Sequence, residues 1–188
     1  VYKRQVLGGA VRHAGAPKCW SDLNGVTHVS LVAAQLARLL EDTNQPPSSL
    51  KAVMLGGGPS SQSLRDSAVR KGLPLFATYG MTETASQVAT GPIAIGDAAT
   101  LAGAPLPGIQ ISIDSSNNEI LVASPTLARG TLVNDALVPF TVPLRTRDVG
   151  FIDAHGRLHV SGRLDAMFIS GGRNIQPEII ERALTDLP

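Results

Sequence analysis

The chain has 188 residues, 43% of them apolar and 16% charged, with a formal net charge of +1, so it is long enough to bury the core of one or two domains. This near-neutral balance gives no electrostatic reason to expect a nucleic-acid partner, and no apolar run approaches the roughly 20 residues of a membrane-spanning helix. The single cysteine, Cys19, excludes an intrachain disulfide and favours a reducing compartment, which we predict to be the cytoplasm.

The first half of the chain predicts strands that alternate with helices. Leucines recur on one stripe of residues 33–42, which predicts a helix. A second helix should begin at a cap formed by Ser60 or Ser61 and end at Gly72. Strands and helices at these spacings indicate right-handed parallel units, which we expect to extend to about residue 91. The apolar runs expected as strands are residues 26–32, 51–55 and 73–78.

Beyond residue 91 the pattern changes to short strands joined by turns, which predicts a small antiparallel β unit. A last helix should begin near Pro177, because proline is favoured in the first turn of a helix. The expected fold class is therefore α/β, with a parallel sheet and helices followed by a small antiparallel β unit. The strands of this unit are expected at residues 109–113, 119–122, 149–153 and 158–161.

The most informative motif directly follows the third predicted strand and has the sequence Thr-Tyr-Gly-Met-Thr-Glu-Thr at residues 78–84. Open α/β sheets bind ligands at the carboxyl ends of their strands. At such an edge the ring of Tyr79 can stack on a base and Thr82 can donate to a phosphate oxygen. The carboxylate of Glu83 can hold a hydrated Mg²⁺. The motif therefore predicts a nucleotide site.

Two other motifs allow both a structural and a functional interpretation. Gly56, Gly57 and Gly58 precede Pro59 and can be a plain turn from a strand to a helix or the floor of a binding site. They are not a phosphate-binding P-loop, because the Lys-Ser/Thr pair that should follow is missing. Asp148, just before a predicted strand, can be a charged turn residue or can accept hydrogen bonds from both hydroxyls of a ribose.

Three motifs in chain order resemble those of the adenylate-forming superfamily of acyl-CoA synthetases, luciferases and adenylation domains. Residues 79–83 resemble its Tyr-Gly-x-Thr-Glu signature, and residues 146–148 resemble Thr-Gly-Asp, with Arg147 in place of glycine. Residues 162–178 resemble the Gly-Arg-x-Asp hinge and the loop that follows it. This resemblance implies that residues 1–164 are the C-terminal part of a large adenylation domain. Residues 165–188 would then be a hinge and the start of a small C-terminal domain.

The resemblance also implies a role for each motif residue. Thr82 would bind phosphate and Glu83 would hold Mg²⁺, so both would serve the chemistry of adenylation. Asp165 would be the hinge between the two domains. The residues implied in binding ATP or CoA are Gly56, Gly57 and Gly58 beneath the nucleotide and acyl group, Tyr79 and Gly80 at the adenine, Asp148 and Arg163 at the ribose, and Gly171 and Gly172 along the pantetheine arm of CoA.

Further segments are similar to one subfamily, the o-succinylbenzoate–CoA ligases of menaquinone biosynthesis: residues 27–40, 50–57, 132–135 and 170–178. This implies a small-molecule carboxylic acid, ATP and CoA as partners, with no nucleic acid and no membrane insertion. The alternatives are another acyl- or aryl-CoA ligase and a non-catalytic nucleotide-binding or interaction module.

The superfamily has a phosphate loop upstream and a lysine in its C-terminal domain that do not occur in this sequence. We therefore expect an internal fragment that is inactive on its own. Residues 1–5 fit no expected element, and the sequence does not indicate an oligomeric state.

Overall fold

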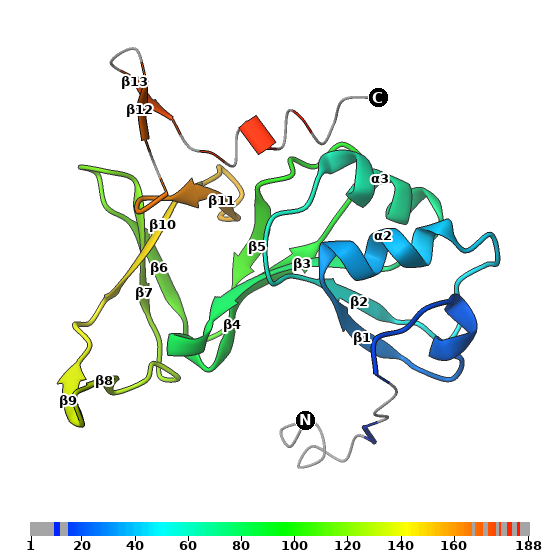
Figure 1. Cartoon of the computed structure of the whole chain (residues 1–188), viewed down its shortest axis with the longest axis horizontal. Coiled ribbons are helices and arrows are strands. Elements are labelled where there is room, and N and C mark those ends of the chain that lie inside the picture. The colour runs from blue at the N-terminus through cyan, green and yellow to red at the C-terminus, as the bar shows by residue number, and fades with distance from the viewer. Residues whose placement is uncertain are drawn as a thin grey trace.

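The structure, a computed structural model, describes residues 10–11, 15–166, 168–170, 173–175, 177, 180–181 and 184. Residues 1–5, Gly171 and Gly172 lie outside the described residues, as do the expectations placed on them. Figure 1 shows two helices packed beside the first strands of one long sheet, which continues away from them through the later strands.

The first part of the sheet is parallel, as predicted. Its strands β1, β2 and β3 pair side by side in parallel register, and helices α2 and α3 connect them. Both helices lie on the same side of these strands (Figure 1). The bounds of these elements are η1 Trp20–Leu23, β1 His28–Leu31, α2 Ala33–Glu41, β2 Ala52–Leu55, α3 Gln62–Arg70 and β3 Leu75–Met81.

Local sequence signals set the ends of helix α3. The side chain of Ser61 accepts a hydrogen bond from the backbone N–H of Leu64 at 3.2 Å, so Ser61 is the N-cap. Gly72 follows the C-cap with φ of +83°, a left-handed conformation that ends many helices. Strand β3 is longer than predicted, because it continues through Tyr79 and Gly80 to Met81.

The later strands pair antiparallel and extend the same sheet. The strand order is β1-β2-β3-β4-β5-β11-β10-β7-β6, and the change from parallel to antiparallel pairing comes between β3 and β4. The predicted turns at residues 117–118 and 154–156 join β6 to β7 and β10 to β11. The bounds are β4 Ser86–Pro92, β5 Leu101–Pro105, β6 Gln110–Ile113, β7 Glu119–Ala123, β10 Leu144–Ile152 and β11 Leu158–Arg163.

Strands β4 and β5 were not predicted, because their sequences are rich in small residues, glycine and proline. Backbone contact explains one of these glycines. A Cβ atom on Gly103 would lie 2.1 Å from the backbone carbon of Thr90, so only glycine allows β5 to lie this close to β4. The strands form through pairing with their neighbours rather than through alternating hydrophobic residues.

Two short hairpins lie outside the main sheet. Strands β8 (Gly130–Val133) and β9 (Ala136–Pro139) pair around Asn134 and Asp135, which both have positive φ. Strands β12 (Phe168–Ser170) and β13 (Arg173–Ile175) form the second hairpin. Pro177 is helical, as are residues 180, 181 and 184, in line with the helix expected there.

Two apolar clusters form the core, one in each part of the sheet. The first lies against the helices and includes Leu36 and Leu39 of α2, which are completely buried. The second lies in the antiparallel part and includes Ile120 and Leu158, with Tyr79 packed against it. Full burial of each such side chain contributes roughly 1.5–3 kcal/mol to folding. Tyr79 therefore lies at the junction of the two parts.

None of the helices in the described residues combines the length and the apolar character that crossing a bilayer requires.

Candidate functional site

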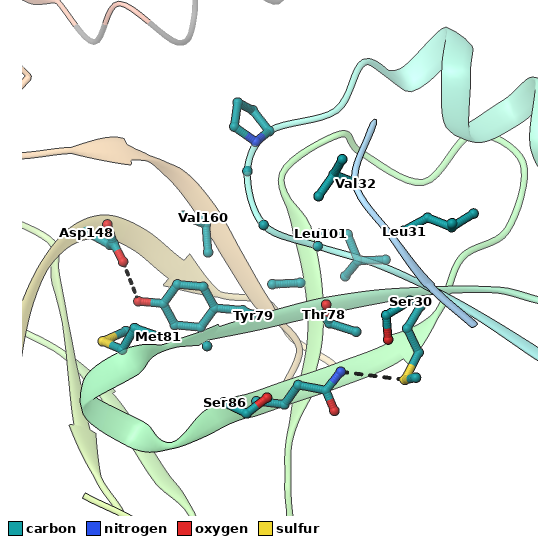
Figure 2. A pocket seen from close by; sticks show the side chains of 18 of the residues that line it. Ser30, Leu31, Val32, Thr78, Tyr79, Met81, Ser86, Leu101, Asp148 and Val160 are labelled. Atoms are coloured by element: carbon teal, nitrogen blue, oxygen red, sulfur yellow. Dashed lines mark hydrogen bonds between the residues drawn. The ribbon is translucent and has the colours of Figure 1, made fainter. Parts of the chain in front are cut away.

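A cavity of about 890 Å³ lies where the parallel and antiparallel parts of the sheet meet. Its volume is within the range of small-molecule sites, about 300–1,000 Å³. Figure 2 shows side chains of β1, β3, β4 and the later strands around it. The residues singled out from the sequence that line it are Gly56, Gly57, Gly58, Tyr79, Gly80, Thr82, Asp148 and Arg163. Glu83 and Asp165 are not among its lining residues.

Tyr79 and Asp148 form the central contact of the cavity. The phenolic O–H of Tyr79 donates to Oδ2 of Asp148 at 2.6 Å, and Figure 2 shows the ring directed at this carboxylate. Burial of the phenol, and then the adjacent charge of Asp148, raise the pKa of Tyr79 far above its ordinary value. The phenol therefore stays protonated and keeps donating to Asp148 at any physiological pH.

Arg163 links Asp148 to Asp165. Its Nη1 donates to Oδ1 of Asp148 at 3.0 Å, while Nε and Nη2 donate to the two oxygens of Asp165 at 2.8 and 2.9 Å. These bonds to Asp165 are the main cause that raises the pKa of Arg163 and lowers the pKa of Asp165. The pair with Asp165 is about half exposed, so water weakens it. The guanidinium thus contacts both the proposed ribose acid and the expected hinge.

The segment before Asp148 is irregular. Arg147 has φ of +67°, a left-handed conformation that a non-glycine residue seldom adopts, and it stands where the superfamily motif has glycine. The pairing of β10 with β7 shifts register between Arg145 and Val149, which marks a β-bulge. Thr146 accepts a bond from the backbone N–H of Asp148 at 3.1 Å. The bulge therefore places Asp148 at the cavity.

Close packing explains why a glycine follows β2, without reference to a ligand. A Cβ atom on Gly56 would lie 2.2 Å from Oγ1 of Thr78, which itself donates to the backbone C=O of Leu55 at 3.0 Å. Gly56 also lines the cavity. The structural and the functional interpretation of this turn are thus compatible, because the same close packing leaves a flat backbone surface at the cavity.

Thr82 and Glu83 lie in the short 3-10 turn η2 (Thr82–Thr84) after β3. Thr82 is exposed and lines the cavity, whereas Glu83 is half-buried outside its lining. Within the described residues, no hydrogen bond or ion pair occupies the carboxylate of Glu83, and no group of three His, Cys, Asp or Glu side chains forms a metal cluster. A single carboxylate fits Mg²⁺, which commonly binds one or two carboxylates together with water and phosphates.

The motifs did not identify Arg65, which also lines the cavity. It lies on α3 with 7% of its surface exposed, and its guanidinium donates to Oγ of Ser60 at 2.7 Å and to the C=O of Leu101 at 2.9 Å. It thereby ties α3 to β5 beside the cavity. The sequence did contain one indication of this role. Arg65 lies three residues before Ala68, which places an arginine on the buried face of the helix.

Comparisons with known proteins agree on one family. Residues 7–134 match the family described as AMP-binding enzyme. A 2-succinylbenzoate–CoA ligase of Salmonella typhimurium (strain LT2) is 41% identical over 169 residues, which cover 88% of this chain and 35% of that protein. This chain spans about a third of the length of such curated relatives.

Solved structures give the same result. A variant of E. coli MenE with bound OSB-AMS matches with a TM-score of 0.77 at 39% identity, covering 90% of this chain and 37% of that one. O-succinylbenzoate coenzyme A synthetase from Bacillus subtilis, in complex with ATP and magnesium ion, matches with a TM-score of 0.76 at 35% identity, covering 86% of this chain and 37% of that one. The α/β architecture predicted from the sequence is confirmed.

Proposed function

Because the chain belongs to the family of AMP-binding enzymes, as its motifs predicted, we propose that it forms part of an ATP-dependent acid–CoA ligase. The proposed activity belongs to a protein that contains this chain and also the regions that the relatives have beyond it. This protein is called the complete enzyme below. The proposed acid is o-succinylbenzoate, and the proposed product is its CoA thioester for menaquinone biosynthesis. The compartment is the cytoplasm, where ATP and CoA are available.

The observation that carries this proposal is the carboxylate of Asp148, held at the cavity by Tyr79 and Arg163. A fixed carboxylate can accept hydrogen bonds from two adjacent ribose hydroxyls, as acids do in dinucleotide-binding folds. The ring of Tyr79 is fixed by the same contact and offers a surface for adenine, beside Gly80. Gly56, Gly57 and Gly58 form the floor beneath the nucleotide and the acyl group.

In the first half-reaction, an oxygen of the substrate carboxylate attacks the α-phosphorus of ATP. The bond from that phosphorus to the bridging oxygen breaks, and pyrophosphate leaves with the electron pair. Thr82 donates to a phosphate oxygen. Glu83 would hold Mg²⁺, and the ion would supply positive charge to the phosphates. Catalysis of this kind depends on positioning and charge more than on covalent chemistry by the protein.

In the second half-reaction, the thiolate of CoA attacks the carbonyl carbon of the acyl-adenylate, and AMP leaves. We assign residues 1–164 to the large domain and residues 165–188 to the hinge and the start of a small domain that rotates between the two steps. Asp165 is the proposed hinge. Gly171 and Gly172, which lie outside the described residues, are proposed to line the path of the thiol.

The test is acid-dependent exchange of pyrophosphate into ATP by the complete enzyme, followed by thioester formation with CoA. A panel of o-succinylbenzoate, benzoate and straight-chain fatty acids defines the substrate. Glu83→Gln is the control variant, because it keeps the shape of the side chain and removes the charge that would hold Mg²⁺. We expect exchange with o-succinylbenzoate in the wild type and at least about 100-fold less in the variant, the loss that removing one transition-state contact can cause.

Two other outcomes distinguish the alternatives. Exchange that prefers a different acid would identify another acyl- or aryl-CoA ligase. Binding of AMP without exchange for any acid would indicate a non-catalytic nucleotide-binding module and would overturn the proposal.

A further inference from the structure

Glu119 is a buried carboxylate that the proposed mechanism does not use. It begins strand β7 and is 1% exposed. Its Oε2 lies 2.5 Å from Nη2 of Arg145, which also contacts Asp114 at 2.7 Å. Its Oε1 accepts the backbone N–H of Arg147 at 2.9 Å. A charge buried this deeply is tolerated only when it is paired and hydrogen-bonded, and here both oxygens have partners.

The N–H that Glu119 holds belongs to a residue in an unfavourable backbone conformation beside the site. Arg147 has φ of +67°, a left-handed backbone conformation that is unfavourable for a residue with a side chain. Such a conformation persists only where the surroundings hold it. The contact from Glu119 comes from the neighbouring strand, directly across the register shift between β10 and β7.

The conformation of Arg147 determines where Asp148 points. Asp148 follows it in the chain, and its carboxylate accepts hydrogen bonds from Tyr79 and Arg163 at the cavity. A relaxed, extended Arg147 would remove the bulge and turn the following side chain to a different direction, because successive side chains of a strand alternate between its two faces.

We propose that Glu119 is a positioning residue for nucleotide binding: by accepting the N–H of Arg147 it holds the left-handed bulge that directs Asp148 at the ribose. This inference rests on the proposed function, because it assigns the ribose to Asp148. Glu119 itself touches no substrate. The essential feature is the Glu119 oxygen that accepts the N–H of Arg147. The ion pair with Arg145 holds the carboxylate in the position where this oxygen can accept.

Two substitutions in the complete enzyme separate the acceptor from the charge. Glu119→Met keeps the length of the side chain and removes both charge and acceptor, whereas Glu119→Gln removes the charge and keeps an oxygen that can accept from Arg147. We expect Glu119→Met to raise the KM for ATP at least about tenfold, with a smaller change in kcat and in the KM for the acid. The KM for ATP of Glu119→Gln should be at least about threefold lower than that of Glu119→Met.

Asp114→Asn is the matched control. It removes one carboxylate charge from the same ion-pair group around Arg145, but Asp114 does not contact Arg147. We expect its KM for ATP to equal that of the wild type.

Arg147→Gly provides a rescue, because glycine adopts a positive φ without strain. In the double variant with Glu119→Met, it should lower the KM for ATP at least about threefold relative to Glu119→Met alone.

Four results would overturn the inference: an unchanged KM for ATP in folded Glu119→Met, equal loss in Glu119→Met and Glu119→Gln, equal loss in Asp114→Asn, or no rescue by Arg147→Gly. If Glu119→Met does not fold, Glu119→Asp replaces it, because its carboxylate is one methylene too short to reach Arg147. An unchanged KM in that variant would also overturn the inference. Absence of acid-dependent exchange in the wild type would instead contradict the proposed function, so the two failures are distinguishable.

Discussion

At the scale of single residues, Asp148 is the point where three parts of the chain meet. Tyr79 comes from β3, Arg163 from the end of β11, and Asp148 itself from β10. Both of its oxygens already accept a hydrogen bond, and a carboxylate oxygen can accept more than one. Its orientation is therefore fixed before a nucleotide arrives, which lowers the entropic cost of binding.

Replacing Asp148 with alanine in the complete enzyme should weaken ATP binding with less effect on the acid. Each hydrogen bond to a charged group contributes about 1.5–3 kcal/mol, so losing the bonds to the ribose should raise the KM for ATP by about 100-fold. Asp148→Asn, which keeps one acceptor oxygen and the size, should fall between wild type and alanine. An unchanged KM for ATP in the alanine variant would remove Asp148 from the site.

The phenol of Tyr79 should remain protonated in strongly alkaline solution. Burial and the charge of Asp148 raise its pKa above the ordinary value of 10, so the O–H bond to Asp148 is present below that pH and is lost only well above it. Tyrosinate absorbance of the wild type minus that of Tyr79→Phe should therefore show no ionisation below about pH 11. Asp148→Asn should move this ionisation to lower pH, and a wild-type phenol that titrates normally would contradict the contact.

The types of residue in this site could be predicted from the sequence, but their contacts could not. Tyr79, Asp148 and Arg163 belong to short motifs whose side chains suit a nucleotide. Their convergence depends on strand pairings that join distant segments. Glu119 and Arg65 were missed for a related reason, since each is a charged residue without a motif whose role appears only once its buried partners are known.

At the scale of elements, the end of β11 joins the cavity to the proposed hinge. Arg163 contacts Asp148 on one side and Asp165 on the other. A rotation about Asp165 would have to change its bidentate ion pair with Arg163. The same guanidinium contacts Asp148, so the domain motion would also affect the residue proposed to bind the ribose.

Asp165→Pro in the complete enzyme should affect the second half-reaction more than the first. Proline fixes φ near −65°, which should prevent rotation at a hinge. We expect acid-dependent pyrophosphate exchange to persist while thioester formation falls by at least about 100-fold, the scale expected for misplaced reacting groups. Equal loss of both half-reactions would contradict a hinge role.

Asp165→Ala is the control for that experiment. It removes the same ion pair with Arg163 but leaves the backbone free to rotate. Thioester formation in the alanine variant should therefore stay within about tenfold of the wild type, because an exposed ion pair contributes little. If alanine and proline behave alike, the ion pair and not the rotation is responsible.

The elements with local signals were predicted well. Strands β1 and β2 have apolar runs, α2 has its leucine stripe, and α3 has a serine cap and a terminal glycine. The exposed hairpin of β8 and β9 was not predicted, although apolar residues flank its two-residue turn, Asn134 and Asp135. Strands β4 and β5 lack such patterns. Their strand conformation comes from pairing, which depends on the rest of the sheet and is invisible in a short window of sequence.

At the scale of the whole molecule, acid should weaken the fold. Hydrogen bonds lower the pKa values of four aspartates below 3.8, to about 2 for Asp114, mainly through Ser116. A carboxyl with a lowered pKa in the folded state stabilises above its unfolded value, and this stability is lost as pH falls through the folded value. The urea concentration at the unfolding midpoint of the complete enzyme should decrease as the pH is lowered from about 4 to about 2. In Asp114→Asn this decrease should be smaller. A midpoint independent of pH over this range would contradict the prediction.

The position of β11 in the sheet affects how the chain can fold during its synthesis. Strand β11, the last of the nine, lies between β5 and β10, and among the described strands it alone pairs the group β1–β5 with the group β10, β7 and β6. Until the ribosome has released residue 163, the strands before β11 can form only two separate sheets, each with an unpaired edge. Such edges invite pairing with other chains. Insertion of β11 covers both edges at once and closes the cavity, so the nascent chain should depend on chaperones until that strand emerges.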